Sequence, residues 1–287
     1  HSVRGAPPDI EKVTRAEILD RYKGTFAPGL VTLAVAGDVG LDELKAKLLA
    51  RFGAWKAAAP AAAVPGHAPR PAKGAARIVL VDVPGAAQSQ VYVTDEGTAF
   101  GDKDRIPLGV MNAILGGMFS SRINLELRET RAYTYGAHSR FSMRHGAGPF
   151  VAGGAIFADH TADAASVLLA EVDRIRREPV TAVELADAKE NARLALPARF
   201  ESVDDITGAL QDMAAYHLPL DEYANRAARI DAVTAAEVQR VAEKWLKPDG
   251  LRVVVTGDRS KIEKGLAALP IGGGAIETRD AYGDPVK

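Results

Sequence analysis

The same pattern of residues occurs near both ends of this chain of 287 residues, in a single register. Residues 10–38 match residues 230–258 without gaps, and each matched pair has one offset: 234 minus 14 and 258 minus 38 both equal 220. Unrelated helices can share a capping box by chance, but a register kept across helix, strand and helix indicates a repeated structural unit. The matched residues of the first copy are Ile10, Val13, Thr14, Ala16, Glu17, Pro28, Val35, Gly37 and Asp38.

This repeat predicts the domain organisation. A unit of about 220 residues is expected twice in the parent protein, and this chain is expected to hold only the tail of the first copy. The start at His1, without a methionine, suggests processing or truncation. The predicted parts are the C-terminal end of a truncated first unit at 1–55, an Ala/Pro-rich linker at 56–75, a complete second unit at 76–270 and a loosely ordered tail at 271–287.

The first of these parts reads as helix, strand, helix. Thr14 and Glu17 form a capping box that opens a helix through Tyr22. The β-branched run from Leu30 to Ala36 predicts a strand, and leucines at helical spacing predict a helix from Leu41 to Phe52.

The second unit alternates short strands with amphipathic helices. Asp104 can cap one helix, Ser120 or Ser121 the next, and Thr181 opens a third with a second capping box. Strands followed by helices and one returning strand predict an α+β fold, a two-layer sandwich with helices on one face of a mostly antiparallel sheet. The predicted strands are 77–83, 88–94, 251–256 and a hairpin of 133–143 with 150–157.

Composition excludes several classes of function. The net charge of -1 provides no field that would attract nucleic acid or a membrane surface. The absence of cysteine excludes disulfides, thiolate metal sites and cysteine nucleophiles. The longest apolar runs are shorter than the roughly 18 to 20 residues that span a bilayer.

No zinc or serine-hydrolase motif occurs. The six histidines never form His-x-x-Glu-His, its inverse or a His-x-x-x-His pair, so the sequence predicts no metal site in this chain. Ser120 lacks the flanking glycine of a nucleophile elbow. Gly116 and Gly117 precede a helix start and could present backbone donors to an anion, although the chain has neither a Gly-x-Gly-x-x-Gly motif nor a Walker lysine.

Arg128 and Tyr135 remain as candidate functional residues. Both donate hydrogen bonds at neutral pH and neither is a general base there, so they suit the binding of a carbonyl or the stabilisation of an oxyanion. From the residues alone, the alternative stays open that Arg128 pairs with a nearby glutamate and that Tyr135 is a half-buried strand residue.

The central stretch resembles a known family. The segments Leu115-Gly-Gly-Met-Phe-Ser-Ser-Arg122 and Glu126-Leu-Arg128-Glu-Thr-Arg131, followed by Tyr135, resemble the second-half signature of pitrilysin/insulinase-type zinc metallopeptidases, which include the mitochondrial processing peptidase. The resemblance covers nearly the whole chain and agrees with the repeat. Met118 departs from the pattern, because the family often has a third glycine there, and this puts close approach of a substrate backbone in doubt.

The resemblance implies a division of labour between two units. In the family, the first unit carries the His-x-x-Glu-His zinc helix, and the second is metal-free and supplies an arginine and a tyrosine that reach the substrate. Arg128 and Tyr135 fall on those positions, and Gly116 and Gly117 fall on the glycine-rich turn. The expected cofactor is therefore none in this chain, with zinc on the partner unit, which lies in the same parent chain or in a separate subunit.

The resulting hypothesis is the substrate-holding half of a zinc metalloendopeptidase, inactive alone, that binds the scissile carbonyl of peptides cut at a zinc site on the partner. The alternative within the same family is a structural subunit whose catalytic ancestry is vestigial. A weaker alternative is an anion-binding module at the Gly116-Gly117 turn. Family resemblance suggests a periplasmic location, or otherwise a cytoplasmic one.

Overall fold

The structure is a computed structural model that describes residues 5, 7–26, 28, 31–56 and 77–286. The predicted linker at 56–75 lies almost wholly outside the described residues. The chain divides into two compact units: the first contains residues 1–68 and 196–222, and the second contains residues 69–195 and 223–287. Each unit is described by itself.

The first unit is helical in its described part. Thr14 caps α2 as predicted: its Oγ1 accepts a hydrogen bond from the Glu17 amide at 3.3 Å, and the Glu17 carboxylate accepts one from the Thr14 amide at 2.8 Å. The elements are α1 (Pro7–Ile10), α2 (Arg15–Thr25), α3 (Leu41–Phe52), a 3-10 turn at Pro197–Phe200 and α8 (Val203–Ala215).

The strand predicted from Leu30 to Ala36 is wrong for the residues that the structure describes. Leu30 lies outside them, and residues 31–36 form neither helix nor strand. A strand is stabilised by backbone hydrogen bonds to a neighbouring strand, and the described part of the first unit contains no other strand. The apolar side chains of Val31, Leu33 and Val35 are consequently exposed.

The second unit contains the sheet. Its strands are β1 (Ile78–Asp82), β2 (Gln88–Glu96), β3 (His138–Phe141), β4 (Pro149–Phe157), β5 (Arg252–Gly257) and β6 (Ile276–Arg279). Its helices are α4 (Arg105–Asn112), α5 (Arg122–Asn124), α6 (Thr161–Arg177), α7 (Ala182–Leu194), α9 (Arg226–Asp231), α10 (Ala235–Trp245) and α11 (Arg259–Ala267), with π-helical turns at Ala113–Gly117 and Leu125–Thr130 and 3-10 turns at Ala158–His160 and Gly272–Gly274.

The six strands have the order β3-β4-β2-β5-β1-β6. The pairs β3/β4, β4/β2 and β2/β5 are antiparallel, and β5/β1 and β1/β6 are parallel. The predicted β3–β4 hairpin is confirmed, with His138 opposite Gly153. β1 and β2 follow each other in the chain, but β5 returns from the far end of the unit and lies between them.

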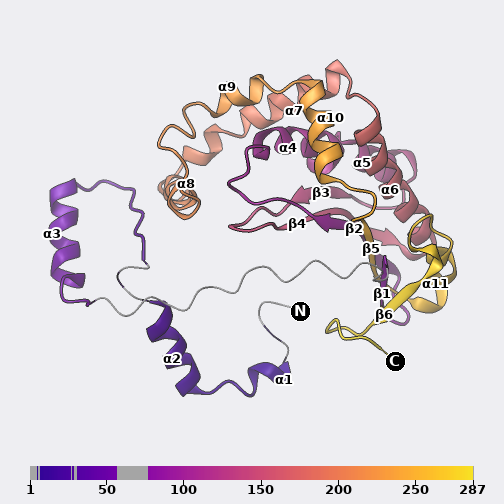
Figure 1. Ribbon diagram of the computed structural model, residues 1–287, viewed down its shortest axis with the longest axis horizontal. Coiled ribbons are helices and arrows are strands. Elements are labelled where there is room, and N and C mark those ends of the chain that lie inside the picture. The colour runs from indigo at the N-terminus through magenta and orange to yellow at the C-terminus, as the bar shows by residue number, and fades with distance from the viewer. Residues whose placement is uncertain (1–4, 6, 27, 29–30, 57–76, 287) are drawn as a thin grey trace. The chain divides into compact units, whose positions relative to one another are not determined.

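Helices cover one face of this sheet (Figure 1), with α6 against β2 and β4 and α11 against β1. Burial alternates along β2 and β5, so every second side chain enters the core and the intervening ones are partly exposed. The core between the layers includes Val91, Leu108 and Leu168, which are fully buried. The predicted α+β two-layer fold with a mostly antiparallel sheet is therefore confirmed.

Two further features bear on the sequence predictions. The tail at 271–287 is not loosely ordered throughout, because β6 pairs with β1 and extends the sheet. Helices α2 and α10 both have 11 residues and both begin at a capping box, with their starts 220 positions apart as 235 minus 15. The internal repeat itself remains a prediction.

None of the described helices is long and apolar enough to span a bilayer.

Candidate functional site

Arg128 lies on a short helix that carries it to the surface of the second unit. Helix α5 continues into the π-helical turn Leu125–Thr130, and Leu127 of that turn is fully buried, which anchors it in the core. The Arg128 guanidinium carbon lies 4.6 Å from the centroid of the Phe119 ring, and its Nε lies 3.4 Å from Oε1 of Glu129. Its side chain is 39% exposed, so the guanidinium is accessible to a ligand.

A tight turn leads from this helix to Tyr135. Ala132 has φ of 53°, in the left-handed region, and its amide donates to the Arg128 carbonyl at 3.2 Å, which closes the helix with an αL cap. The Tyr133 amide also donates to the Leu127 carbonyl, at 2.9 Å. Thr134 is buried, and its hydroxyl donates to the Ala155 carbonyl at 2.6 Å. Through this hydrogen bond Thr134, the residue immediately before Tyr135, is held against β4.

Tyr135 is 82% exposed, so it is not the half-buried strand residue of the alternative interpretation. It precedes β3, and its ring meets the Phe157 ring edge-on at a centroid distance of 5.8 Å. Arg128 and Tyr135 therefore each rest against a different aromatic ring. Both present hydrogen-bond donors to solvent from a backbone that buried neighbours hold in place.

Asn124 connects the segments that carry these residues. It is 5% exposed; its Nδ2 donates to the Phe119 carbonyl at 2.7 Å, and its Oδ1 accepts from the Ala137 amide at 3.2 Å. One side chain thus fixes the loop under Arg128 and the segment that follows Tyr135. Sequence analysis did not single out Asn124, although a polar residue between the apolar Ile123 and Leu127 was a usable signal.

Gly116 and Gly117 lie in the π-helical turn that ends the α4 helix, and the structure gives Gly116 a packing role. A Cβ atom at Gly116 would lie 2.5 Å from the Ser139 amide nitrogen. Asn112 holds the same residue of β3, because its Nδ2 donates to the Ser139 carbonyl at 3.0 Å and its Oδ1 accepts from the Ser139 hydroxyl at 2.8 Å. The glycine lets this helix approach the outer edge of β3.

Replacement of Gly116 by alanine is expected to destabilise the chain by about 1–3 kcal/mol, because the added methyl group meets β3 backbone that cannot move freely. Gly109→Ala is the matched control in the same helix: nothing lies within 4 Å of its added Cβ, so a gain of about 0.5–1 kcal/mol is expected. Urea unfolding of both variants measures the difference. Equal effects of the two substitutions would contradict this role for Gly116.

The predicted serine caps are absent from the helix that carries Arg128. Ser121 occupies the N-cap position, yet its side chain makes no capping hydrogen bond, and its buried hydroxyl has no partner among the described residues. Ser120 is exposed. The helix is instead anchored by Arg122 at its first position.

Arg122 forms a bidentate ion pair with Glu184 of α7, with Nε to Oε1 at 2.6 Å and Nη2 to Oε2 at 2.9 Å. The side chains are 7% and 27% exposed. The hydrogen bond from Arg122, with that from the Thr181 amide, outweighs the effect of burial and lowers the pKa of Glu184 to about 2. The pair joins the start of the Arg128 helix to α7, whose predicted capping box at Thr181 is confirmed.

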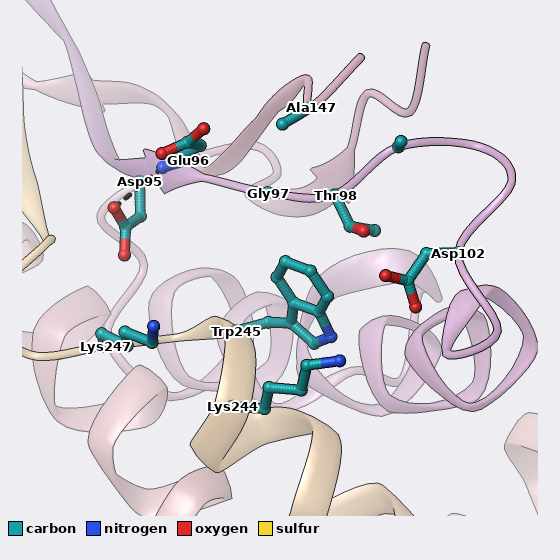
Figure 2. Close-up of a pocket in the computed structure, with 10 residues that line it drawn as sticks. Asp95, Glu96, Gly97, Thr98, Asp102, Ala147, Lys244, Trp245 and Lys247 are labelled. Atoms are coloured by element: carbon teal, nitrogen blue, oxygen red, sulfur yellow. Dashed lines mark hydrogen bonds between the residues drawn. The ribbon is translucent and has the colours of Figure 1, made fainter. Parts of the chain in front are cut away.

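A second candidate site is a hollow of about 370 Å³ where β2 ends, in which the Trp245 indole lies between the end of β2 and Asp102 (Figure 2). Its basic and aromatic groups already interact within the protein. Lys244 Nζ donates to Asp104 Oδ2 at 2.6 Å and lies 4.5 Å from the centroid of the Trp245 ring. We therefore interpret the hollow as part of the framework.

Asp104 does not cap α4 with its side chain, contrary to the prediction. The carboxylate, 2% exposed, accepts hydrogen bonds from Arg240 at 2.9 Å, Lys244 at 2.6 Å and the Trp245 indole at 3.1 Å. Burial raises the pKa of Asp104, but these donors outweigh that effect and hold the pKa well below its ordinary value. Asp104 thereby joins the start of α4 to the end of α10.

Asp104→Asn is expected to lower the free energy of unfolding by about 2 kcal/mol at pH 7, because hydrogen bonds to a charged acceptor are lost. The folded-state pKa lies below the unfolded value of about 3.9, so this contribution is complete above that value and is lost as the pH falls through the folded-state pKa. Denaturant unfolding between pH 7 and pH 2 checks both statements, with the exposed Asp249→Asn as control. If the difference in free energy of unfolding between the unsubstituted chain and Asp104→Asn grew toward low pH, it would contradict them.

Among the described residues no group of His, Asp or Glu is arranged to hold a metal ion. His160 stacks on Tyr133 at a centroid distance of 4.1 Å, and His138 Nε2 lies 3.1 Å from Arg140 Nη1. His1 and His67 lie outside the described residues. The described residues therefore include two exposed hydrogen-bond donors, Arg128 and Tyr135, and no cluster of metal ligands.

Comparison with known proteins yields a family match. The model of the peptidase M16 inactive domain matches residues 12–192. An uncharacterized zinc protease of Mycobacterium tuberculosis (strain H37Rv) is 25% identical over 244 residues, which cover 85% of this chain and 56% of that protein. The chain thus spans about half the length of this curated relative.

Solved structures resemble the chain as well. A peptidase M16 inactive domain from Pseudomonas fluorescens matches with a TM-score of 0.79 and 27% identity, over 90% of this chain and 61% of that one. A chain of complex III2 from Candida albicans, with Inz-5 bound, matches with a TM-score of 0.67 and 14% identity, over 90% of this chain and 62% of that one. The second likeness is one of fold alone.

Proposed function

The chain belongs to the family of the peptidase M16 inactive domain, and from this premise we propose that it is the substrate-holding half of a zinc metalloendopeptidase. In this proposal Arg128 and Tyr135 donate hydrogen bonds to the carbonyl oxygen of the peptide bond that is cut. The observation that carries it is the exposure of both donors on backbone that buried residues hold in place.

The chemistry of the two side chains supports this role. Arginine stays protonated throughout the usable pH range, and a tyrosine hydroxyl is a donor at neutral pH, so both can stabilise negative charge that develops on a carbonyl oxygen. Their immediate contacts leave them accessible: the Arg128 guanidinium lies over the Phe119 ring with Glu129 at 3.4 Å, and the Tyr135 ring meets Phe157 edge-on.

A partner unit supplies the metal in this proposal. The described residues do not fit a zinc ion, since they lack a cluster of three His, Asp or Glu ligands. The M. tuberculosis relative is named a zinc protease, and this chain matches 56% of its length. We therefore place zinc, and the water that it activates, on a unit with a His-x-x-Glu-His motif, and we confine this chain to binding and polarising the carbonyl.

Zinc content and cleavage of a quenched, unstructured peptide test the proposal. The chain alone is expected to bind no stoichiometric zinc and to cut nothing, and both properties are expected once the zinc-bearing unit of the parent protein is supplied. Stoichiometric zinc in the isolated chain would overturn the assignment of the metal to a partner. Zinc binding without any cleavage in the reconstituted protein would favour the structural-subunit alternative.

A further inference from the structure

Phe119 is an exposed aromatic residue whose backbone is held firmly. It lies in the loop between the π-helical turn Ala113–Gly117 and α5, and its side chain is 65% exposed. The buried Asn124 fixes its carbonyl at 2.7 Å. Because the ring is largely exposed, it contributes little to the core.

The ring lies against Arg128, one of the two candidate donors. The guanidinium carbon lies 4.6 Å from the ring centroid, within the range of a cation–π interaction. A guanidinium that stacks on a ring keeps the N–H groups at its edge available to donate. Glu129 is a weaker restraint, because its distance to Arg128 is 3.4 Å and both side chains are well exposed.

Ordering a long arginine side chain opposes binding, since fixing its rotamers loses conformational entropy when the substrate is bound. A ring that already confines the guanidinium reduces that loss. Asn124 adds to this by joining the Phe119 carbonyl to the Ala137 amide, two residues beyond Tyr135. The ring that restrains Arg128 is therefore tied to the segment that presents Tyr135.

We propose that Phe119 is a positioning residue that holds the Arg128 guanidinium ready for the substrate carbonyl. This inference rests on the function proposed above for Arg128. It requires the face of an aromatic ring at position 119 rather than apolar volume, so tyrosine should replace phenylalanine and leucine should not. Because Phe119 is 65% exposed, neither substitution threatens the fold.

NMR of the full chain tests the contact without reference to activity. In the unsubstituted chain the δ-methylene and Nε–H proton signals of Arg128 should show the upfield shift of protons above a ring face. Phe119→Leu should abolish that shift and Phe119→Tyr should retain it, while Tyr282→Leu, which removes an exposed ring from the C-terminal segment, should leave it unchanged. Arg128 signals that do not respond to Phe119→Leu would overturn the proposal.

Kinetics of the chain reconstituted with the zinc-bearing unit test the consequence. Phe119→Leu should lower kcat/KM about 2- to 5-fold, equivalent to about 0.5–1 kcal/mol at 1.36 kcal/mol per tenfold, and Phe119→Tyr should restore it. In an Arg128→Ala background Phe119→Leu should cost nothing further, and an undiminished cost there would overturn the proposal. If Arg128→Ala itself left turnover unchanged, the role proposed for Arg128 would fail, whereas the NMR result would still decide whether Phe119 holds Arg128.

Discussion

Arg128→Ala, in the chain reconstituted with its zinc-bearing unit, is expected to lower kcat by about 10²–10³. The reason is that a donor aimed at a developing oxyanion acts in the transition state more than in the ground state, so its loss raises the barrier by about 2.7–4 kcal/mol. Steady-state cleavage of a quenched peptide measures the effect. Tyr135→Phe removes only the phenol donor, keeps the ring against Phe157, and is expected to give a loss of similar size.

Matched controls lie on the same stretch of chain. Arg131→Ala removes a cation that pairs with Glu126 at 2.9 Å, and Tyr133→Phe removes a hydroxyl while the ring keeps its stack on His160. Neither residue is assigned to the substrate, so each variant should keep turnover within about twofold of the unsubstituted enzyme, and stability measured in parallel should be unchanged. Full activity in both Arg128→Ala and Tyr135→Phe would refute the roles proposed for this pair.

Glu184→Ala is expected to lower the free energy of unfolding by about 3–5 kcal/mol. The partner Arg122 has a side chain only 7% exposed, and removal of the carboxylate leaves its guanidinium buried without a counter-charge. This loss of stability affects the helix that carries Arg128, because Arg122 is the first residue of α5. Urea unfolding followed by circular dichroism measures it.

Two controls separate the ion pair from the helix cap that Glu184 also provides. Glu237 occupies the same place in the capping box of α10, so Glu237→Ala should cost only about 1 kcal/mol. The double variant Arg122→Met and Glu184→Met should recover most of the loss, because a buried ion pair can be replaced by apolar residues at little cost. A double variant no more stable than Glu184→Ala would contradict this account.

The same pair predicts a dependence on pH. The pKa of Glu184 is lowered to about 2 in the folded chain, against about 4.3 in the unfolded one. The stability that the carboxylate contributes is therefore complete above about pH 5 and is lost as the pH falls toward about 2. The difference in free energy of unfolding between the unsubstituted chain and Glu184→Ala should therefore become smaller as the pH falls from about 5 to about 2.

Local sequence signals predicted the helix starts and the outline of the sheet. The boxes at Thr14 and Thr181 open α2 and α7 as expected, because a capping box places the residues that satisfy the first free amides within four positions of each other. The hairpin of β3 with β4 was predicted for the same reason of proximity in the chain. The resemblance to the pitrilysin/insulinase-type family also came from a single stretch, residues 115–135, and the family match confirms it.

The predictions that failed depend on residues far apart in the chain. Asp104 looked like a helix cap, but three donors on α10, some 140 positions away as 244 minus 104, compete for its carboxylate. Residues 31–36 look like a strand, but strand propensity forms no strand without a neighbour.

For this protein, then, the sequence by itself determined most of the elements, the capping boxes at Thr14 and Thr181 and the fold class, because these follow from periodicity and from contacts within a few residues. The choice of Arg128 and Tyr135 as candidate donors came from the resemblance to a family. Only the tertiary structure placed β5 between β1 and β2 and set Phe119 under Arg128. It also showed that Asn124 joins the segments of Arg128 and Tyr135. In addition, it showed that a side chain at Gly116 would clash with the backbone of β3. These arrangements depend on which surfaces meet once the core is buried, and no local pattern records that.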